Sequence, residues 1–210
     1  VRKSFEATSV TINPISRLHQ IDKSETSIES NEHLEKLIIE KLNIDWGIKI
    51  DHIFPKNFDY RLFSESKNIT IAVRENNNVV DFWPGLVEKI YGVSIDIGST
   101  TIAVNLSDLK TGELLASEGS MNPQIRFGED LMSRVSYVMM NPGGDKEMAS
   151  CVRLGVEELI VSASKQAKIE VTDILEIVFV GNPVMHHLFL GIDPIELGGA
   201  PFALSFDGSI

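Results

Sequence analysis

The sequence has a single cysteine, Cys151, among its 210 residues, which excludes an intramolecular disulfide. One thiol also cannot supply the ligands of an iron–sulfur cluster, and so little cysteine is typical of a reducing cytoplasm. Positive charge is scarce too, because 19 Lys+Arg residues stand against 30 Asp+Glu residues and leave a formal net charge of −11. Since nucleic-acid binding depends on Lys and Arg neutralising phosphates, we expect no nucleic-acid partner.

Long apolar runs are missing as well. No stretch approaches the roughly 20 apolar residues of a membrane span, and the N-terminus shows no signal-peptide pattern, so we expect a cytoplasmic protein with no membrane partner. The sequence does contain 43% hydrophobic and 23% charged residues, which is typical of a globular protein that buries a core. At roughly 100–200 residues per domain, its length predicts one or two domains.

Residues 1–88 are expected to form a small α+β domain. Its expected elements are an extended strand up to about residue 17, a polar loop over 20–31, a helix capped by Asn31 and a hairpin over 69–83. The Pro84-Gly85 pair ends the hairpin, and we therefore place the domain boundary just after it.

Residues 89–210 show a different pattern of elements. We expect strands over 92–97, 101–106 and 113–120, helices over about 131–139 and 146–168, a strand over 176–180 and a helix from Asn182 to about Gly191. The first three strands are predicted to form an antiparallel meander, because short polar turns join them. The predicted fold class is α/β (α+β), in βββαβα order with two successive helices at the first α position.

The most informative motif runs from Asp96 to Thr101, with the sequence DIGSTT. A strand delivers Asp96 to its carboxyl end, and Gly98 permits a backbone conformation that other residues resist. Ser99, Thr100 and Thr101 offer hydroxyl and N–H groups that can wrap a phosphate. Asp96, the candidate catalytic residue, would lie beside a Mg²⁺ ion, directly or through its water shell. The alternative is a plain hairpin whose Gly-Ser-Thr segment is only a turn.

The segment Asn122–Asp130 is a second candidate, for contact with phosphate or with a partner. A loop that enters a helix places unpaired N–H groups near the Arg126 guanidinium, and together they can hold an anion. Asp130 also suits the positive end of the helix dipole, which is the structural alternative for this residue.

The segment Gly181-Asn182-Pro183 follows a strand, at the end of a sheet where α/β proteins place ligands. We therefore add Gly181, Asn182 and His186 to the candidate contacts. His186 and His187 point about 100° apart on a helix, which makes them poor joint ligands of a metal. The simpler interpretation is that one histidine is packed and the other is solvated.

These motifs resemble those of a known superfamily. The hairpin over Asp96–Thr101 looks like the phosphate-1 motif of the actin-like ATPases, which include sugar kinases and heat-shock chaperones. The segments YGVSIDIGSTTIAVNLSDLKTGELL, NPQIRFGEDLMSRVSY and VFVGNPVMHHLFLGIDP are similar to the reductive activators of corrinoid proteins. The resemblance implies a lead-in and middle domain over residues 1–88 and the first half of an actin-like, ribonuclease H-like ATPase domain over residues 89–210.

The resemblance also implies a function. In that family an N-terminal [2Fe–2S] ferredoxin-like domain precedes the middle domain, and hydrolysis of ATP with Mg²⁺ is coupled to returning an inactive Co(II) corrinoid to Co(I). The four cysteine ligands of the cluster are not in this sequence, so we expect the cluster on a domain outside it. We expect an interior segment of a homodimeric activator whose partners are a corrinoid protein and an electron donor, and which hydrolyses ATP only as the whole protein.

Two alternatives remain open at this point. A small-molecule kinase of the same superfamily would need an acidic general base, which no residue here identifies. A non-catalytic docking module would use a degenerate phosphate loop only to shape an interface.

Overall fold

The computed structural model describes residues 16–22, 28–50, 59–63, 65–74 and 79–200. The chain divides into two compact units, unit 1 ending at Lys89 and unit 2 beginning at Ile90. Each unit contains a β-sheet and at least one α-helix, so the expected mixed α+β class is confirmed. In the described part of the chain, no helix is both long enough and apolar enough to cross a membrane.

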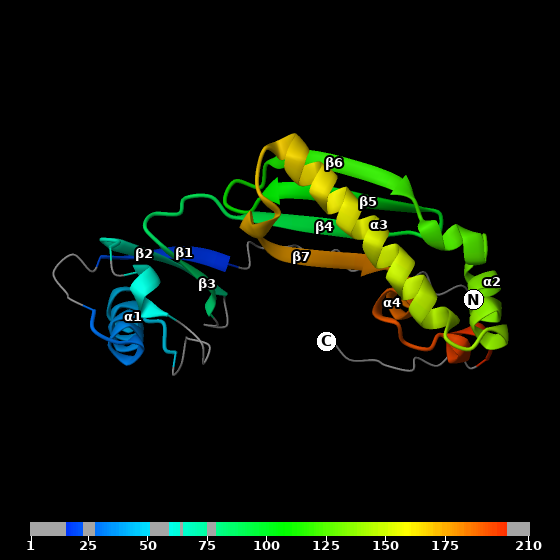
Figure 1. The fold of residues 1–210 in the computed structure, drawn as a ribbon, viewed down its shortest axis with the longest axis horizontal. Coiled ribbons are helices and arrows are strands. Elements are labelled where there is room, and N and C mark those ends of the chain that lie inside the picture. The colour runs from blue at the N-terminus through cyan, green and yellow to red at the C-terminus, as the bar shows by residue number, and fades with distance from the viewer. Residues whose placement is uncertain (1–15, 23–27, 51–58, 64, 75–78, 201–210) are drawn as a thin grey trace, which may run out of the picture. The chain divides into compact units, whose positions relative to one another are not determined.

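Unit 1 is an antiparallel sheet with a helix packed on it (Figure 1). Its elements are β1 (Ser16–Asp22), α1 (Asn31–Trp46), the 3-10 helix η1 (Tyr60–Phe63), β2 (Asn68–Arg74) and β3 (Val79–Pro84), and the strand order is β1-β2-β3. The core of unit 1 combines every fourth residue of α1 with alternate residues of the sheet and with Phe63 of η1. The residues from α1 and the sheet are Ile21, Leu34, Ile38, Leu42, Ile69, Ile71 and Val73. These two spacings are the ones that place side chains on one face of a helix and of a strand.

The first strand differs from the sequence prediction. Most of the strand expected up to residue 17 lies outside the described residues, and β1 begins at Ser16 and extends into the segment that we expected to be a loop. The polar loop was therefore predicted to begin too early. The reason is tertiary pairing, because Ile21 lies opposite Ile69 of β2 and is buried there.

The start of α1 is a smaller correction. Its N-cap is Ser30, whose hydroxyl accepts a hydrogen bond from the N–H of His33 at 3.1 Å. The predicted cap, Asn31, instead accepts a hydrogen bond from the distant N–H of Tyr60 at 2.8 Å. Ser and Asn are about equally good N-caps, so the local sequence does not decide between them.

Unit 2 is built on a four-stranded sheet of order β6-β5-β4-β7. The meander of β4 (Tyr91–Ile97), β5 (Thr101–Asp108) and β6 (Leu114–Met121) is antiparallel as predicted, and β7 (Ile174–Gly181) adds parallel to β4. The helical elements are η2 (Pro123–Phe127), α2 (Leu131–Met140), α3 (Gly144–Ala167), η3 (Val171–Asp173), α4 (Pro183–Leu190) and η4 (Ile195–Gly198).

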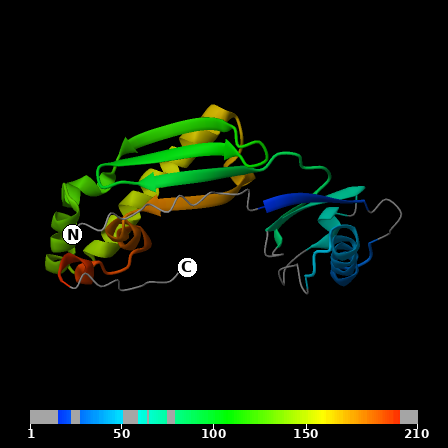
Figure 2. The same cartoon turned by 180° about the vertical axis from the view of Figure 1, so that it is seen from behind.

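Helix α3 runs across one face of this sheet, and among the described residues no helix covers the other face (Figures 1 and 2). The alternation along β4 explains the arrangement, because Val93, Ile95 and Ile97 are buried while Asp96 is exposed. Side chains at every second position of a strand share a face, so the apolar set faces α3 and Asp96 lies on the uncovered face. The burial pattern of β4 thus delivers an exposed carboxylate to the end of a buried strand.

We predict that Ile95 is essential to the core of unit 2. Ile95 is 1% exposed, and Ile95→Ala is expected to lower the free energy of unfolding by about 2–5 kcal/mol. The matched control is Ile177→Ala on β7, where the side chain is 46% exposed and the expected loss is about 1 kcal/mol or less. Denaturant titration measures both losses. Equal losses of unfolding free energy in the two variants would contradict the position of Ile95 in the core of unit 2.

Candidate functional site

The candidate site lies where β4 and β7 end. Ile97 of β4 is opposite Gly181 of β7, and Thr101 at the start of β5 is opposite Met121 at the end of β6. This register brings several of the predicted site residues to one end of the sheet, namely Asp96, Gly98, Ser99, Thr100, Thr101, Asn122, Gly181 and Asn182.

The backbone of the β4–β5 loop is held from inside the protein. Asn122 donates two hydrogen bonds to it, from its side-chain amide to the carbonyl oxygen of Gly98 at 2.8 Å and from its backbone N–H to the carbonyl oxygen of Thr100 at 2.7 Å. The guanidinium of Arg134 donates to the carbonyl oxygen between them, that of Ser99. Three successive carbonyl groups of the loop therefore have buried donors.

These bonds set the direction of the loop's N–H groups. In a trans peptide the C=O and the N–H point in opposite directions. With the carbonyls of Gly98 and Ser99 turned inward, the N–H groups of Ser99 and Thr100 point away from their buried donors. Neither N–H donates to an acceptor in the described part of the chain. Adjacent N–H groups presented in this way can bind an anion such as phosphate.

The loop requires glycine at position 98 because a side chain would not fit there. Its N–H donates to the carbonyl oxygen of Thr101 at 2.9 Å, and a Cβ atom at Gly98 would lie only 2.8 Å from that oxygen. The prediction that Gly98 supplies an unusual backbone conformation is wrong, because its φ is outside the left-handed region. Glycine is required here because the two backbones approach each other closely. The backbone torsion angles of Gly98 do not require it.

Arg134 is the site residue that the sequence analysis missed. Its side chain is fully buried, and besides Ser99 it donates to the carbonyl oxygen of Gly128 at 2.9 Å, to the Sδ of Met185 at 3.3 Å and to the Oε1 of Gln124 at 3.4 Å. Burial lowers the pKa of its guanidinium, which nevertheless stays charged because arginine does not deprotonate in proteins.

The sequence did contain a signal for Arg134. Leu131 and Val138 are three positions before it and four positions after it in α2, so all three side chains share the inner face of the helix. An arginine on an apolar helix face must find internal acceptors or a charged partner. That pattern alone does not identify which acceptors it reaches.

Asn122 and Asn182 are both helix caps. The Oδ1 of Asn122 accepts from the N–H of Gln124 at 2.9 Å, and the Oδ1 of Asn182 accepts from the N–H of Met185 at 3.0 Å. Asn122 is 1% exposed, so it acts on a ligand only through the loop that it supports. On α4, His186 is exposed and His187 is buried, and the ring of His187 donates to the carbonyl oxygen of Pro183 at 2.8 Å.

Arg126 and Asp130 make contacts away from the loop. The Arg126 guanidinium stacks on the ring of Phe127, 4.6 Å from its centroid, and lies near the thiol of Cys151, whose pKa burial raises. Asp130 is the N-cap of α2 and accepts from the N–H of Ser133 at 2.7 Å. Both candidate residues are exposed, and within the described residues neither forms a hydrogen bond with the β4–β5 loop.

Comparison with known proteins identifies the family. The family model described as "RACo middle region" matches residues 91–209, which is more than half of the chain. The chain belongs to the RACo family. It is 34% identical over 154 residues to "Corrinoid activation enzyme RamQ" of Eubacterium limosum, in an alignment that covers 72% of this chain and 26% of the relative.

The fold of this RACo chain is also found in a solved structure. A "Reductive activator for corrinoid,iron-sulfur protein" superposes with a TM-score of 0.77 at 25% identity, over 91% of this chain and 32% of that chain. The expected resemblance to reductive activators of corrinoid proteins is therefore confirmed. The chain spans between about a quarter and a third of the length of these two relatives.

The RACo match lies within unit 2 and contains every predicted site residue. The part of the chain that matches the "RACo middle region" is therefore residues 91–209, whereas the sequence analysis gave the name "middle domain" to residues 1–88. The name "middle domain" for residues 1–88, and the interpretation of residues 89–210 as half of an ATPase domain, stay predictions.

We predict that Gly98→Ala distorts the loop. The added Cβ meets a backbone oxygen that cannot rotate away, and we expect a loss of roughly 1–3 kcal/mol in the free energy of unfolding. The control is Gly119→Ala in β6, whose Cβ would lie 3.4 Å from the carbonyl oxygen of Ile102. Thermal unfolding compares the two variants, and a Gly98→Ala protein as stable as the control would show that the close approach is absent.

The N-cap at Asp130 predicts a pH dependence. Hydrogen bonds from Ser133 hold the pKa of Asp130 below its usual range, so its stabilising effect is present above the pKa of the unfolded state and is lost as the pH falls through the folded-state pKa. Asp130→Ala should therefore lower Tm at neutral pH, and its difference from the wild type should shrink under acidic conditions. Glu129→Ala, at the neighbouring exposed carboxylate, serves as the control. A difference that is independent of pH would contradict this role.

Proposed function

We propose that this chain supplies the phosphate-binding loop and a partner-contact surface of an ATP-dependent reductive activator, which returns an inactive Co(II) corrinoid protein to Co(I). One observation carries the proposal. The carbonyl groups of Gly98, Ser99 and Thr100 are bonded inward, so that the N–H groups of Ser99 and Thr100 are left for an anion. The membership of the RACo family supports the rest.

Asp96 fits a role at a magnesium ion carried by the nucleotide. Its exposed carboxylate lies two residues before Gly98, and it forms no hydrogen bond within the described part of the chain. In those residues no group of three or more His, Cys, Asp or Glu side chains could hold a metal by itself. Mg²⁺ is commonly held by one or two carboxylates together with phosphate oxygens and water, and it would neutralise phosphate charge there.

The loop contributes positioning. Orienting a phosphate chain against fixed N–H donors lowers the entropic cost of the reactive arrangement, and the Ser99, Thr100 and Thr101 hydroxyls are close enough in sequence to add contacts. Reduction of the cobalt needs an energy source, and nucleotide binding can bias a protein toward the conformation that binds the nucleotide better. The redox step itself belongs to the cobalt and to a [2Fe–2S] cluster, for which this sequence has no cysteine ligand set.

The partner contacts are proposed on exposed residues of the segments near this end of the sheet. Arg126, Asp130 and His186 present charged or polar side chains to solvent from the segments that follow β6 and β7. The names of the two relatives mention corrinoid activation and a corrinoid, iron–sulfur protein. A corrinoid protein is therefore the proposed partner, together with an electron donor for the cluster and a second copy of the activator in a cytoplasmic homodimer.

Asp96→Ala in the full-length protein tests the proposal. We expect ATP-stimulated reduction of Co(II) to fall roughly tenfold to a hundredfold, as for the loss of groups that support a bound metal, while binding of the corrinoid protein stays measurable. Optical spectra of the corrinoid follow the reduction. Glu113→Ala, at an exposed carboxylate in the β5–β6 turn at the opposite end of the sheet, is the control. Undiminished stimulation in Asp96→Ala would remove Asp96 from the mechanism, and a wild type without any ATP stimulation would refute the proposed function.

A further inference from the structure

Arg134 carries a buried charge that forms no ion pair in the part of the chain that the structure describes. Its four hydrogen-bond acceptors are two carbonyl oxygens, an amide oxygen and a thioether sulfur, all of them neutral. Asp130 is the carboxylate whose charge acts on it, but the oxygens of Asp130 are exposed and bonded to Ser133 instead. A buried charge is costly unless a partner of opposite sign compensates it.

Hydrogen bonding to the loop does not by itself require this charge. The neighbouring carbonyl oxygen of Gly98 is satisfied by the neutral side-chain amide of Asn122 at 2.8 Å. A neutral donor could satisfy the carbonyl oxygen of Ser99 in the same way and would avoid the cost of burying a cation. The guanidinium must therefore offer something besides the hydrogen bond.

The position of Arg134 indicates what its charge contributes besides the hydrogen bond. The guanidinium lies behind the peptide that joins Ser99 to Thr100, on the side of the carbonyl oxygen, while the N–H of Thr100 is on the other side. A cation bonded to the C=O polarises the peptide and makes its N–H a stronger donor, and in a buried setting the effect of the charge is weakly screened. The charge thus raises the positive potential at the outer side of the loop, in a chain whose formal net charge is −11.

We propose that Arg134 is a positioning residue of the phosphate loop, and that the phosphate groups of a bound nucleotide are the anion that compensates its buried charge. The proposal rests on the proposed function and adds to it the residue that makes the loop selective for anions. The nucleoside part of the ligand gains nothing from Arg134.

Binding of Mg-ATP and of adenosine to the full-length protein separates the two parts of the ligand. For Arg134→Met we expect the affinity for Mg-ATP to fall roughly tenfold to a hundredfold, the range for a hydrogen bond to a charged group, and the affinity for adenosine to stay unchanged. Arg134→Lys keeps the charge and should recover part of the affinity for Mg-ATP. Isothermal titration calorimetry measures all of these affinities.

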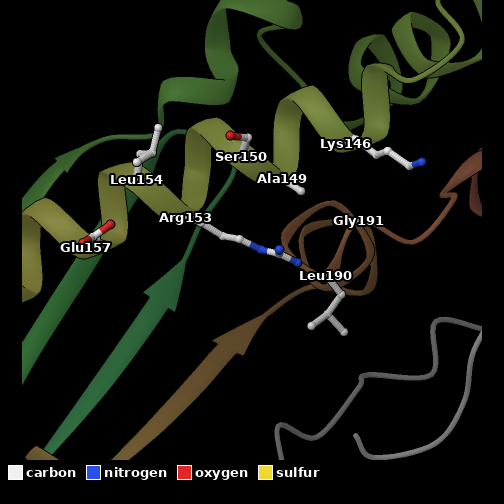
Figure 3. A pocket seen from close by; sticks show the side chains of 8 residues that line it. All are labelled: Lys146, Ala149, Ser150, Arg153, Leu154, Glu157, Leu190 and Gly191. Atoms are coloured by element: carbon white, nitrogen blue, oxygen red, sulfur yellow. The ribbon is translucent and has the colours of Figure 1, made fainter.

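Arg153→Met is the matched control. Figure 3 shows Arg153 on α3, where its side chain points towards Leu190 and Gly191 at the end of α4, in a pocket that contains no residue of the loop. Like Arg134, Arg153 donates to a backbone carbonyl, with its Nε 2.8 Å from the oxygen of Phe189. It is exposed, and we expect the variant to bind Mg-ATP as the wild type does.

Gln124→Glu tests the charge without removing Arg134. The Oε1 of Gln124 is 3.4 Å from Nη1 of Arg134, so a carboxylate at this position would neutralise the guanidinium from inside the protein. We expect weaker binding of Mg-ATP and unchanged binding of adenosine. Circular dichroism establishes which variants are folded, and if Arg134→Met does not fold, Gln124→Glu decides the question.

The outcomes separate this inference from the function on which it rests. A wild-type protein that binds no Mg-ATP refutes the proposed function. If the wild type binds Mg-ATP and the folded Arg134 and Gln124 variants bind it equally well, the proposed function stands and the role of Arg134 is overturned. Equal losses for Mg-ATP and adenosine would also overturn that role, because they would mean that Arg134 only maintains the fold.

Discussion

Unit 2 depends on the position of β4 between two different neighbours. β5 pairs with it in the antiparallel direction through a short hairpin, and β7 pairs with it in the parallel direction after α2 and α3. A parallel neighbour requires a crossover connection, and α3 provides it while covering one face of the sheet. Because β4 is central, its end is also where the β4–β5 loop and the start of α4 meet.

The polar groups at that meeting point form one connected network. Asn122 and Arg134 both bond to the β4–β5 loop, and both also contact the Sδ of Met185 in the first turn of α4. Buried polar groups are costly when unpaired, so each bond in such a network limits the movement of the others. The loop is therefore supported on its inner side by residues from β6's end, α2 and α4, and this support is what turns a short hairpin into a candidate site.

Relatedness to corrinoid activators and the arrangement of the loop are independent observations. The family match rests on sequence similarity along residues 91–209, whereas the direction of the N–H groups follows from hydrogen bonds between particular atoms. Both concern unit 2, where the phosphate site is proposed. The exposed carboxylate of Asp96 and the buried cation of Arg134 would give the proposed site a charged group on each side of the loop.

The sequence by itself determined the strands and helices of unit 2, because alternation in β4 and helical spacing in α3 are local consequences of burying one face. It also determined the DIGSTT motif and the start of a helix at Asn182-Pro183, since both depend on neighbours within a few residues. Only the tertiary structure decided where β1 runs, whether Ser30 or Asn31 caps α1, and that Gly98 is required by a backbone contact. It also decided the contacts of Arg134, whose acceptors lie between 6 and 51 positions away in the chain. Contacts of that kind depend on how elements pack, and no local pattern encodes them.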